Sequence, residues 1–366
     1  MPDDFRIDPW GSSVLYDEDY ERLIKEFGIQ EVSFTDKEKM STNRFFRRKI
    51  IFGHRDLDAI LKAIDNKKPW AVMSGIKPSG PFHLGTLTVA LEIVEFQKMG
   101  AKAYYCIADI ESYEDNGISY KDAEPDAVDN LADILALGLD PDPKKTYIWR
   151  QSEERIVKDV AFKVGRLVTQ NMVNAIYGEK PFGLYLAALI QVGDIVLPQV
   201  LDGPQPTIVP VGIDQDPHLR LTRDLTRRYY KNFFVPGATY HKLLQGLDGS
   251  EKMAKRNPNS YFDFNESLES IEKKIKGAFT GGSNDKKEQE QLGGQPDICM
   301  IYKIEMYHFE EDDAKLEEIY KKCVSGQLMC GDHKKQCVEK VLKFIEDHRK
   351  KKEKLIDTAR ELLNIE

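Results

Sequence analysis

Short apolar runs alternate with amphipathic stretches in the middle of the chain. Residues 70–74 and 103–108 have the pattern of buried strands, and between them the apolar side chains of residues 84–99 recur at helical spacing. Gly100, directly after this stretch, is a helix stop. Two strands joined by a helix predict a parallel pair, because parallel neighbours need a crossover connection.

The same alternation continues to about residue 264 and then ends. We expect further strands at residues 146–149, 207–211 and 239–244. Helices are expected near residues 122–138, 154–178 and 217–231, and then over 268–279, 312–324 and 334–363. The sequence therefore predicts an α/β fold followed by a helical C-terminal domain. An N-terminal extension with a short helix at residues 18–27 precedes both.

Composition agrees with a globular protein of two domains. The 366 residues are 41% hydrophobic and 31% charged, which is enough for one large α/β domain and a smaller second one. No uninterrupted run of about 18 apolar residues occurs, so we expect no membrane span. The N-terminus has no basic start followed by an apolar stretch, so we expect no secretory signal. Five cysteines in such a chain are typical of reduced thiols in a cytoplasmic protein.

The net charge of −8 argues against non-specific binding of nucleic acid by the whole surface. Two local clusters of basic residues remain as candidate contacts. They are Arg220, Arg223, Arg227 and Arg228, and Lys340, Lys343, Arg349, Lys350, Lys351, Lys352 and Lys354. A solvated helix face is the alternative interpretation of both clusters.

The turn that follows the first predicted strand contains candidate anion-binding residues. Gly75 closes the strand, residues 78–80 form the turn, and the next helix begins a few residues later. The free backbone N–H groups at a helix start favour an anion. Gly85 would let a phosphate approach the backbone closely, and His83 can donate a hydrogen bond to it. An ordinary turn with a surface histidine is the alternative.

A second segment, residues 252–256, lies in a polar loop after the last predicted strand. Lys252 and Lys255 place two ammonium groups on this loop. Such groups can close over a pyrophosphate and stabilise its developing charge. A solvated charged loop is the alternative here.

Taken together, these two segments resemble the His-x-Gly-His and Lys-Met-Ser-Lys-Ser motifs of class I aminoacyl-tRNA synthetases. A third segment, residues 212–218, is similar to the Gly-x-Asp-Gln stretch of the tyrosyl and tryptophanyl subclass. Further stretches resemble the tryptophanyl enzymes of archaea and eukaryotes, at residues 8–10, 45–56, 66–69, 212–224, 279–282 and 310–326. The resemblance covers nearly the whole chain in the same order.

Membership of this family would imply a Rossmann-type catalytic domain with an inserted helical segment over residues 66–264. An extension over residues 1–65 and a helical anticodon-binding domain over residues 265–366 complete the expected organisation. The implied reaction activates L-tryptophan with ATP, releases pyrophosphate and transfers tryptophan to tRNA(Trp). Because the substrate carboxylate is the nucleophile, catalysis is positioning plus charge stabilisation. Mg²⁺ is expected on the triphosphate, and the family forms homodimers through the nucleotide-binding domain.

The resemblance also assigns site residues. The implied ATP contacts are Gly75, Pro78, Ser79, His83, Gly85, Thr86, Lys252, Met253 and Lys255, with His83, Lys252 and Lys255 in catalytic roles. The implied amino-acid contacts are Met73, Cys106, Glu111, Gln191 and Gln215, of which the last three hold the ammonium and carboxylate groups. The family's helical domain reads the anticodon, so the basic residues from 340 to 354 become candidate phosphate contacts. We expect no protein metal site, and buried thiols at Cys323, Cys330 and Cys337 near His333.

Three departures from the family pattern affect this interpretation. Thr86 replaces the second histidine of the first motif, and Ala254 and Arg256 replace serines of the second. Met73 and Cys106 stand where the family has tyrosine and glutamine near the indole N–H, and neither is a strong acceptor. A buried indole N–H without a partner costs about 1–3 kcal/mol.

Three consequences are open at this point. Either another group accepts the hydrogen bond from the indole N–H, or the specificity for indole is weaker, or the substrate is not tryptophan. A tyrosine-specific synthetase, another nucleotidyltransferase and a non-catalytic tRNA-binding paralogue are therefore the alternatives.

Overall fold

The computed structural model describes residues 9–10, 17–250, 253, 257–283 and 285–365. By their contacts these residues form two compact units, which are described separately. The first comprises Met1–Gly80, Val89–Lys242 and Lys354–Glu366, and the second comprises Pro81–Thr88 and Leu243–Glu353. The domain boundaries expected at residues 65 and 264 stay a prediction.

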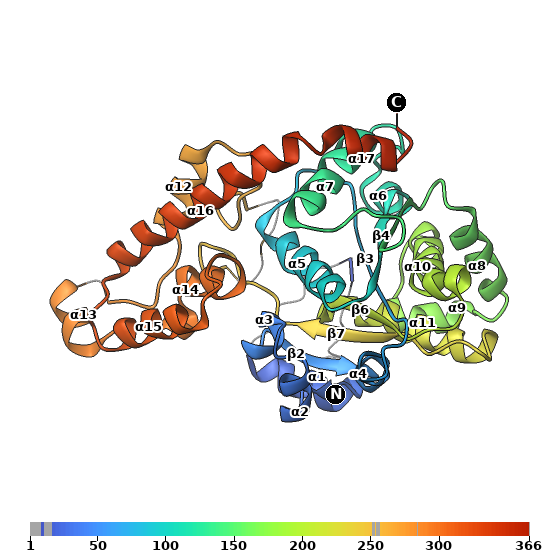
Figure 1. Cartoon of the computed structure of the whole chain (residues 1–366), viewed down its shortest axis with the longest axis horizontal. Helices are drawn as coiled ribbons and strands as arrows, with labels where there is room; N and C mark the ends of the chain where they lie inside the picture. The colour runs from blue at the N-terminus through green and yellow to red at the C-terminus, as the bar shows by residue number, and fades with distance from the viewer. Residues whose placement is uncertain (1–8, 11–16, 251–252, 254–256, 284, 366) are drawn as a thin grey trace. The chain divides into compact units, whose positions relative to one another are not determined.

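A seven-stranded sheet forms the centre of the first unit, in the order β1-β2-β7-β6-β3-β4-β5 (Figure 1). Its strands are β1 (Gln30–Glu31), β2 (Ile51–Arg55), β3 (Ala71–Ile76), β4 (Lys102–Ile107), β5 (Thr146–Arg150), β6 (Thr207–Gly212) and β7 (Gly237–His241). Strands β3 to β7 pair in parallel, whereas β1 and β2 add an antiparallel edge. Chain order reverses between β3 and β6. In an open α/β sheet such a switch point opens a crevice at the carboxyl ends of the strands.

The predicted parallel sheet is therefore confirmed, and the arrangement is of the Rossmann type with a helical C-terminal part. Helices of the first unit are α1 (Asp17–Phe27), α2 (Phe34–Lys39), α3 (Arg44–Arg47), α4 (Leu57–Asp65), α6 (Asp109–Asn116), α7 (Glu124–Leu137), α8 (Arg155–Gly165), α9 (Gln170–Tyr177), α10 (Phe182–Asp202), the short η1 (Ile213–Gln215), α11 (Asp216–Tyr229) and α17 (Ile356–Leu362). Helix α5 (Leu84–Lys98) has its first turn in the second unit and the rest in the first.

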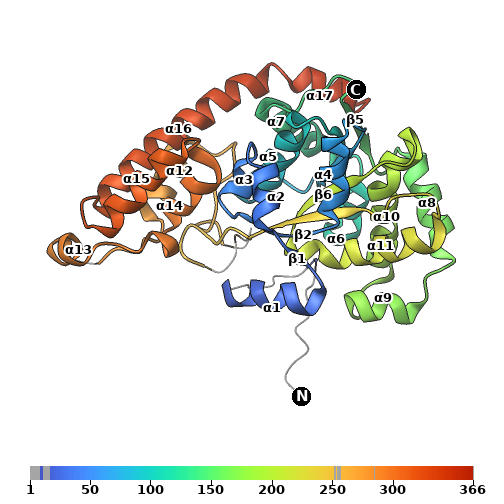
Figure 2. The same ribbon diagram turned by 60° about the horizontal axis from the view of Figure 1, so that its bottom comes forward.

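Two hydrophobic cores hold the first unit together. One lies against the sheet and includes Tyr20 and Ile29, so the N-terminal extension packs on the same core as the parallel strands. The other is shared by α8, α9, α10 and α11, which lie together in both ribbon views (Figure 2). Gly193 of α10 has no room for a side chain, because a Cβ there would lie 2.5 Å from the Val157 carbonyl of α8.

The second unit is helical, as expected. It contains α12 (Leu268–Gly277), α13 (Lys286–Leu292), η2 (Pro296–Ile298), α14 (Met300–Ile304), the π-helical turn η3 (Glu305–Phe309), α15 (Asp313–Val324) and α16 (Cys330–Glu353). Side-chain caps begin several of its helices, with Ser267 on α12 and Asp312 on α15 each accepting a backbone N–H.

Four details differ from the sequence-based expectation. The helix expected over 154–178 is two helices, and the one expected over 334–363 is α16 followed by α17. Strand β2 was missed because its polar side chains hide the strand pattern. Helix α10 was missed because it is apolar on all sides. It is long and apolar enough to cross a membrane by length and composition, although polar side chains interrupt the run, and 67% of that window is buried within the protein.

Candidate functional site

The turn at residues 83–86 lies in the second unit and is held by its own side chains. The Thr86 hydroxyl accepts the His83 N–H at 3.2 Å and donates to the His83 carbonyl at 2.7 Å. The Gly85 N–H donates to Nδ1 of His83 at 3.0 Å. Because Nδ1 is an acceptor, Nε2 carries the ring proton. His83 is therefore a donor through Nε2, as a phosphate contact requires.

The loop at residues 252–256 was expected to bind the same nucleotide as this turn. Met253, the one residue of that loop that the structure describes, lies beside the turn. A Cβ on Gly85 would be 3.5 Å from Sδ of Met253 and 3.0 Å from the His83 ring. Glycine at this position therefore keeps the turn open between two side chains. Lys252 and Lys255 lie outside the described residues, as do Ala254 and Arg256, and their roles stay predictions.

Gly75, Pro78 and Ser79 lie in the first unit, after the centre of β3. A Cβ on Gly75 would be 2.6 Å from the Cys106 carbonyl, so the close approach of β3 and β4 requires glycine. The Pro78 carbonyl accepts from the Ser112 hydroxyl at 3.1 Å, and the Ser79 N–H donates to the Lys77 carbonyl at 2.9 Å. These contacts fix the turn that leaves the sheet.

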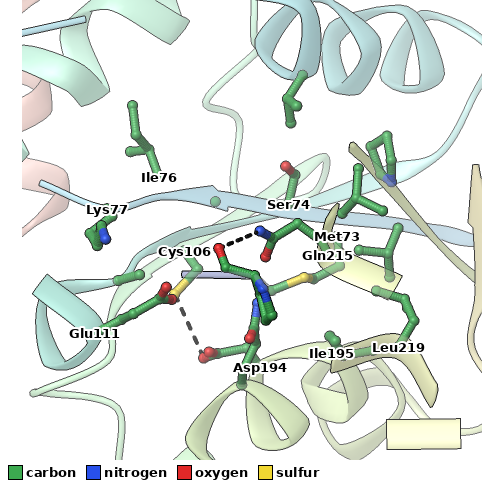
Figure 3. A pocket seen from close by; sticks show the side chains of 18 of the residues that line it. Met73, Ser74, Ile76, Lys77, Cys106, Glu111, Asp194, Ile195, Gln215 and Leu219 are labelled. Atoms are coloured by element: carbon green, nitrogen blue, oxygen red, sulfur yellow. Dashed lines mark hydrogen bonds between the residues drawn. The ribbon is translucent and has the colours of Figure 1, made fainter. Parts of the chain in front are cut away.

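A cavity of about 290 Å³ opens at the carboxyl ends of β3, β4 and β6, at the switch point of the sheet (Figure 3). It approaches the size of small-molecule sites, which begin at roughly 300 Å³. All five residues predicted to contact the amino acid line it, namely Met73, Cys106, Glu111, Gln191 and Gln215. Gly75 and Lys77 line it as well. The structure thus brings together side chains from five separate elements, β3, β4, α6, α10 and η1.

The cavity combines apolar walls with a few polar groups. The apolar side chains come from Met73, Val89, Ile195, Val209, Val211 and Leu219. Of the polar groups, the Gln215 amide donates to the Pro9 carbonyl at 3.4 Å, and the Glu111 N–H donates to Oε1 of Gln151 at 3.3 Å. Burial raises the pKa of Glu111, while the Lys77 ammonium opposes that shift. A cationic ligand would relieve the cost of this buried carboxylate.

Asp194 of α10 also lines the cavity, and sequence reasoning missed it (Figure 3). Its Oδ1 accepts from Nε1 of Trp149 at 3.0 Å and from Sγ of Cys106 at 3.6 Å. Its Oδ2 accepts from Nε2 of Gln151 at 2.6 Å. A carboxylate offers about four acceptor positions, so Asp194 has capacity for one further donor.

Burial shifts the titration of this cluster. It raises the pKa of Asp194 to about 7, against the opposing effect of hydrogen bonds from Gln151, Trp149 and Cys106. Burial and the neighbouring Asp194 carboxylate also raise the pKa of the Cys106 thiol well above its usual value. Cys106 therefore stays protonated at neutral pH and donates to Asp194 rather than accepting from a ligand.

Asp194 had a signal in the sequence, although a weak one. It is the one acidic residue within the long apolar stretch of α10 before its last residue, Asp202, and it follows the predicted contact Gln191 by one helical turn. A carboxylate on a buried helix face is rare unless it has partners. Recognising α10 as a helix would have placed Asp194 and Gln191 on one face.

The other clusters singled out from the sequence have structural partners. His333 bonds to Oε2 of Glu305 at 2.9 Å, and Cys323 and Cys337 are buried as expected. Cys330 is only partly buried, so the prediction of a buried thiol there is wrong, because Cys330 is the first residue of α16. Lys340 pairs with Glu305 and Glu310, at 3.1 and 2.7 Å. Within the residues that the structure describes, no group of three His, Cys, Asp or Glu side chains could hold a metal ion.

In the first basic cluster, Arg223 is buried and engaged. It donates to the Pro236 carbonyl at 2.6 Å and pairs with Asp56 at 2.7 Å. This arginine therefore acts inside the fold and is not a surface contact.

Comparison with known proteins agrees with the geometry. A family model described as tRNA synthetases class I (W and Y) matches residues 65–346. The chain is similar to the tryptophan–tRNA ligase of Methanocaldococcus jannaschii, at 36% identity over 98% of this chain and 98% of that protein. The corresponding protein of Methanopyrus kandleri is 37% identical, over 98% of this chain and 96% of its own length.

A solved structure gives the same result. The tryptophanyl-tRNA synthetase of Aeropyrum pernix K1 has a TM-score of 0.88 to this chain at 37% sequence identity, over 97% of this chain and 98% of that one. These matches, which span nearly the full length, show that the chain belongs to the class I tRNA synthetases of the tryptophan and tyrosine group, and within it to the tryptophan–tRNA ligases.

Proposed function

We propose that this chain activates L-tryptophan with ATP to give tryptophanyl-adenylate and pyrophosphate, and then transfers tryptophan to tRNA(Trp). The observation that carries the proposal is the cavity at the sheet switch point. Five side chains expected to contact the amino acid line it, and a buried carboxylate stands among its apolar walls.

In this cavity the tryptophan ammonium pairs with Glu111, whose burial favours a cationic partner. Gln191 and Gln215 orient the ammonium and carboxylate through their amides. The indole ring packs on the apolar side chains, and its N–H donates to the remaining acceptor position of Asp194. Asp194 thus replaces the acceptors that are absent at Met73 and Cys106.

The carboxylate of tryptophan attacks the α-phosphorus of ATP. A new carboxylate–phosphorus bond forms, and the bond to the bridging oxygen of pyrophosphate breaks. His83 donates through Nε2 to a phosphate oxygen, and Gly85 leaves room for the nucleotide between His83 and Met253. Gly75, Pro78, Ser79 and Thr86 shape the turns around the nucleotide, with the Thr86 hydroxyl holding the His83 backbone. Lys252 and Lys255 stabilise the charge on the leaving pyrophosphate.

Mg²⁺ accompanies ATP in this proposal. The described residues contain no cluster that could hold a metal ion, so the phosphate oxygens themselves would supply its ligands. Bound there, the ion would neutralise part of the charge that develops during phosphoryl transfer.

The proposal also covers the assembly of the protein and its location in the cell. We propose a homodimer through the nucleotide-binding unit, a cytoplasmic location and no insertion in a membrane. Its five cysteines are free, which fits a reducing compartment. The long apolar helix α10 is mostly buried within its own unit, as a core helix is.

Exchange of labelled pyrophosphate into ATP tests the reaction. With folded protein and Mg²⁺, we expect exchange that depends on tryptophan, and charging of tRNA(Trp) in the second step. Tyrosine in place of tryptophan should give at most a small fraction of that exchange. Binding of tRNA without any exchange would instead identify a non-catalytic paralogue.

A further inference from the structure

A short irregular segment, residues 262–266, contacts both helix α16 and the turn that carries His83. All three lie in the second unit. Arg349 of α16 donates from Nε to the Phe264 carbonyl at 2.7 Å and from Nη2 to the Glu266 carbonyl. Lys352 donates to Oδ1 of Asn265 at 3.3 Å. Two basic side chains of α16 therefore hold three consecutive residues of this segment.

Ring packing strengthens the same connection. Phe264 is buried, and its ring centroid lies 5.0 Å from that of His348 and 6.0 Å from that of Phe344, both on α16. On its other side it lies 5.2 Å from the ring of Phe82. Phe264 is thus packed between α16 and the residue that precedes His83.

Backbone hydrogen bonds continue the connection into the turn. The Phe264 N–H donates to the Phe82 carbonyl at 2.8 Å, and the Leu84 N–H donates to the Phe262 carbonyl at 3.1 Å. His83 and Asp263 form an antiparallel bridge between them. The backbone on both sides of His83 is therefore fixed by residues 262–264.

We infer that Arg349 is a positioning residue for ATP. By holding the carbonyls of residues 264 and 266, it fixes the segment that in turn fixes the backbone of His83. This inference rests on the proposed function, because it takes the His83 turn as the ATP contact. It also gives Arg349 a different role from the tRNA phosphate contact that the basic cluster indicates.

The size of the expected effect follows from the contacts. Among the described residues, no helix or strand N–H donates to the carbonyls of Phe264 and Glu266, and the Arg349 fork donates to both. Hydrogen bonds from a charged donor are stronger than neutral ones. A displacement of about 1 Å in a substrate contact can reduce activity on the order of a hundredfold, so partial release of the turn should weaken ATP binding about tenfold.

Four proteins test the inference: the wild type, Arg349→Met, Arg349→Lys and Lys335→Met. Lys335 is exposed on the same helix, so its variant removes one positive charge without touching residues 262–266. Titration calorimetry measures the Kd for ATP, filter binding measures the Kd for tRNA(Trp), and pyrophosphate exchange measures KM for ATP and for tryptophan.

We expect Arg349→Met to raise the Kd and KM for ATP about tenfold, with KM for tryptophan and the Kd for tRNA within about twofold. Arg349→Lys keeps the positive charge but has one donor nitrogen in place of the two that Arg349 uses, so it should lie between Arg349→Met and the wild type. Lys335→Met should match the wild type for ATP. If Arg349→Met does not fold, a raised KM for ATP in Arg349→Lys, with KM for tryptophan unchanged, carries the test.

Two results would overturn the inference. One is an unchanged Kd for ATP with weakened tRNA binding, which would make Arg349 a phosphate contact. The other is an equal loss for ATP and tryptophan together with a lowered Tm, which would make it only structural. If the wild type shows no exchange at all, the proposed function fails, while the calorimetric Kd for ATP still tests the positioning role.

Discussion

Asp194 is a buried carboxylate in a largely apolar cavity, and no lysine, arginine or histidine of the described residues pairs with it. Three donors, from Trp149, Gln151 and Cys106, hold it in place. Buried carboxylates are costly to ionise unless they have such bonds. With three bonds and a pKa of about 7, Asp194 exists in both protonation states near neutral pH. The ionised form is the stronger acceptor, because both of its oxygens share the negative charge, so the affinity for an indole N–H should depend on pH.

The first prediction concerns this dependence. Between about pH 6 and pH 8 the ionised fraction of Asp194 rises, so KM for tryptophan in the wild type should fall. Asp194→Asn cannot ionise, so its KM should be raised about tenfold at pH 8, equivalent to roughly 1.4 kcal/mol, and should vary less with pH. Pyrophosphate exchange across this range measures both effects.

Asp202→Asn is the matched control, because Asp202 lies on the same helix but pairs with Lys102 outside the cavity. Its KM for tryptophan should follow the wild type. The role of Asp194 is contradicted if Asp194→Asn keeps the affinity of the wild type at pH 8.

At the residue scale, sequence reasoning predicted contacts that match motifs and missed those that depend on packing. Gln215 stands in the stretch that is similar to Gly-x-Asp-Gln, whereas Glu111 and Gln191 were predicted from the resemblance of the whole chain. The structure brings all three to one cavity. Asp194 and Gln151 have no motif of their own. Asp194 contacts Cys106 and Gln151, which lie 88 and 43 positions away along the chain, and no local pattern reveals such contacts.

At the scale of elements, one buried ion pair joins α5 to β7. Nδ1 of His241, near the end of β7, lies 3.1 Å from Oε2 of Glu92 on α5, and both side chains are buried. Burial acts to lower the pKa of His241, but the charge and hydrogen bond of Glu92, helped by Asp214, outweigh it and raise the pKa. The protonated pair therefore stabilises the contact between the two elements.

The second prediction follows from the sign of this shift. A histidine whose pKa is raised by folding stabilises the protein below its unfolded pKa of about 6.5, and this contribution is lost as pH rises through the folded pKa. The free energy of unfolding of the wild type should therefore fall between about pH 6.5 and pH 8.5 by about 1 kcal/mol more than that of His241→Gln. Urea unfolding at several pH values measures this difference.

The difference between the wild type and His241→Gln isolates the His241–Glu92 pair from other groups that titrate in this range. Asp194 also loses stabilisation over this range, but it does so equally in both proteins. Burial lowers the pKa of His54, so that residue is neutral throughout the window. Glu92→Gln should flatten the pH dependence as His241→Gln does. Parallel curves for the wild type and both variants would contradict the prediction.

Elements with a strong periodic pattern were predicted well, and those whose pattern depends on tertiary partners were not. Strands β3 to β7 were expected from apolar runs alone. Strand β2 ends in Gly53, His54 and Arg55, and Arg55 is stable there because it donates to Asp216 and Tyr240 far along the chain. That stabilisation is non-local, so the local sequence could not indicate the strand.

At the scale of the whole molecule, the residues proposed to bind the amino acid and those proposed to bind ATP fall partly in different units. The cavity proposed to bind the amino acid lies in the unit that contains the sheet, whereas Pro81–Thr88 belongs to the unit of Leu243–Glu353. Backbone hydrogen bonds of Phe82 and Leu84 with residues 262–264 explain why the His83 turn belongs to the helical unit. The motifs predicted two nucleotide-binding segments. The hydrogen bonds of residues 82–84 with residues 262–264 show which unit holds the His83 turn.

The third prediction concerns assembly. Three large apolar side chains are exposed on two helices that pack against each other: Phe162 of α8 is 88% exposed, and Phe182 and Leu186 of α10 are 67% and 48% exposed. Single exposed apolar residues are common, but several on adjoining helices mark an interaction site. We expect this surface to form the homodimer interface, since a second copy would bury all three side chains on both subunits.

Phe162→Glu should therefore convert the dimer to a monomer, because an unpaired charge in an apolar interface is strongly unfavourable. Light scattering with size-exclusion chromatography measures the mass. Phe34→Glu is the control, because Phe34 is 82% exposed but lies on α2, and this variant should stay dimeric. If Phe162→Glu stays dimeric, the interface lies elsewhere. If the wild type is itself a monomer, the proposed homodimer is wrong. If the dimer is lost while tryptophan-dependent exchange persists, each amino-acid cavity works within a single chain, and assembly serves the tRNA step alone.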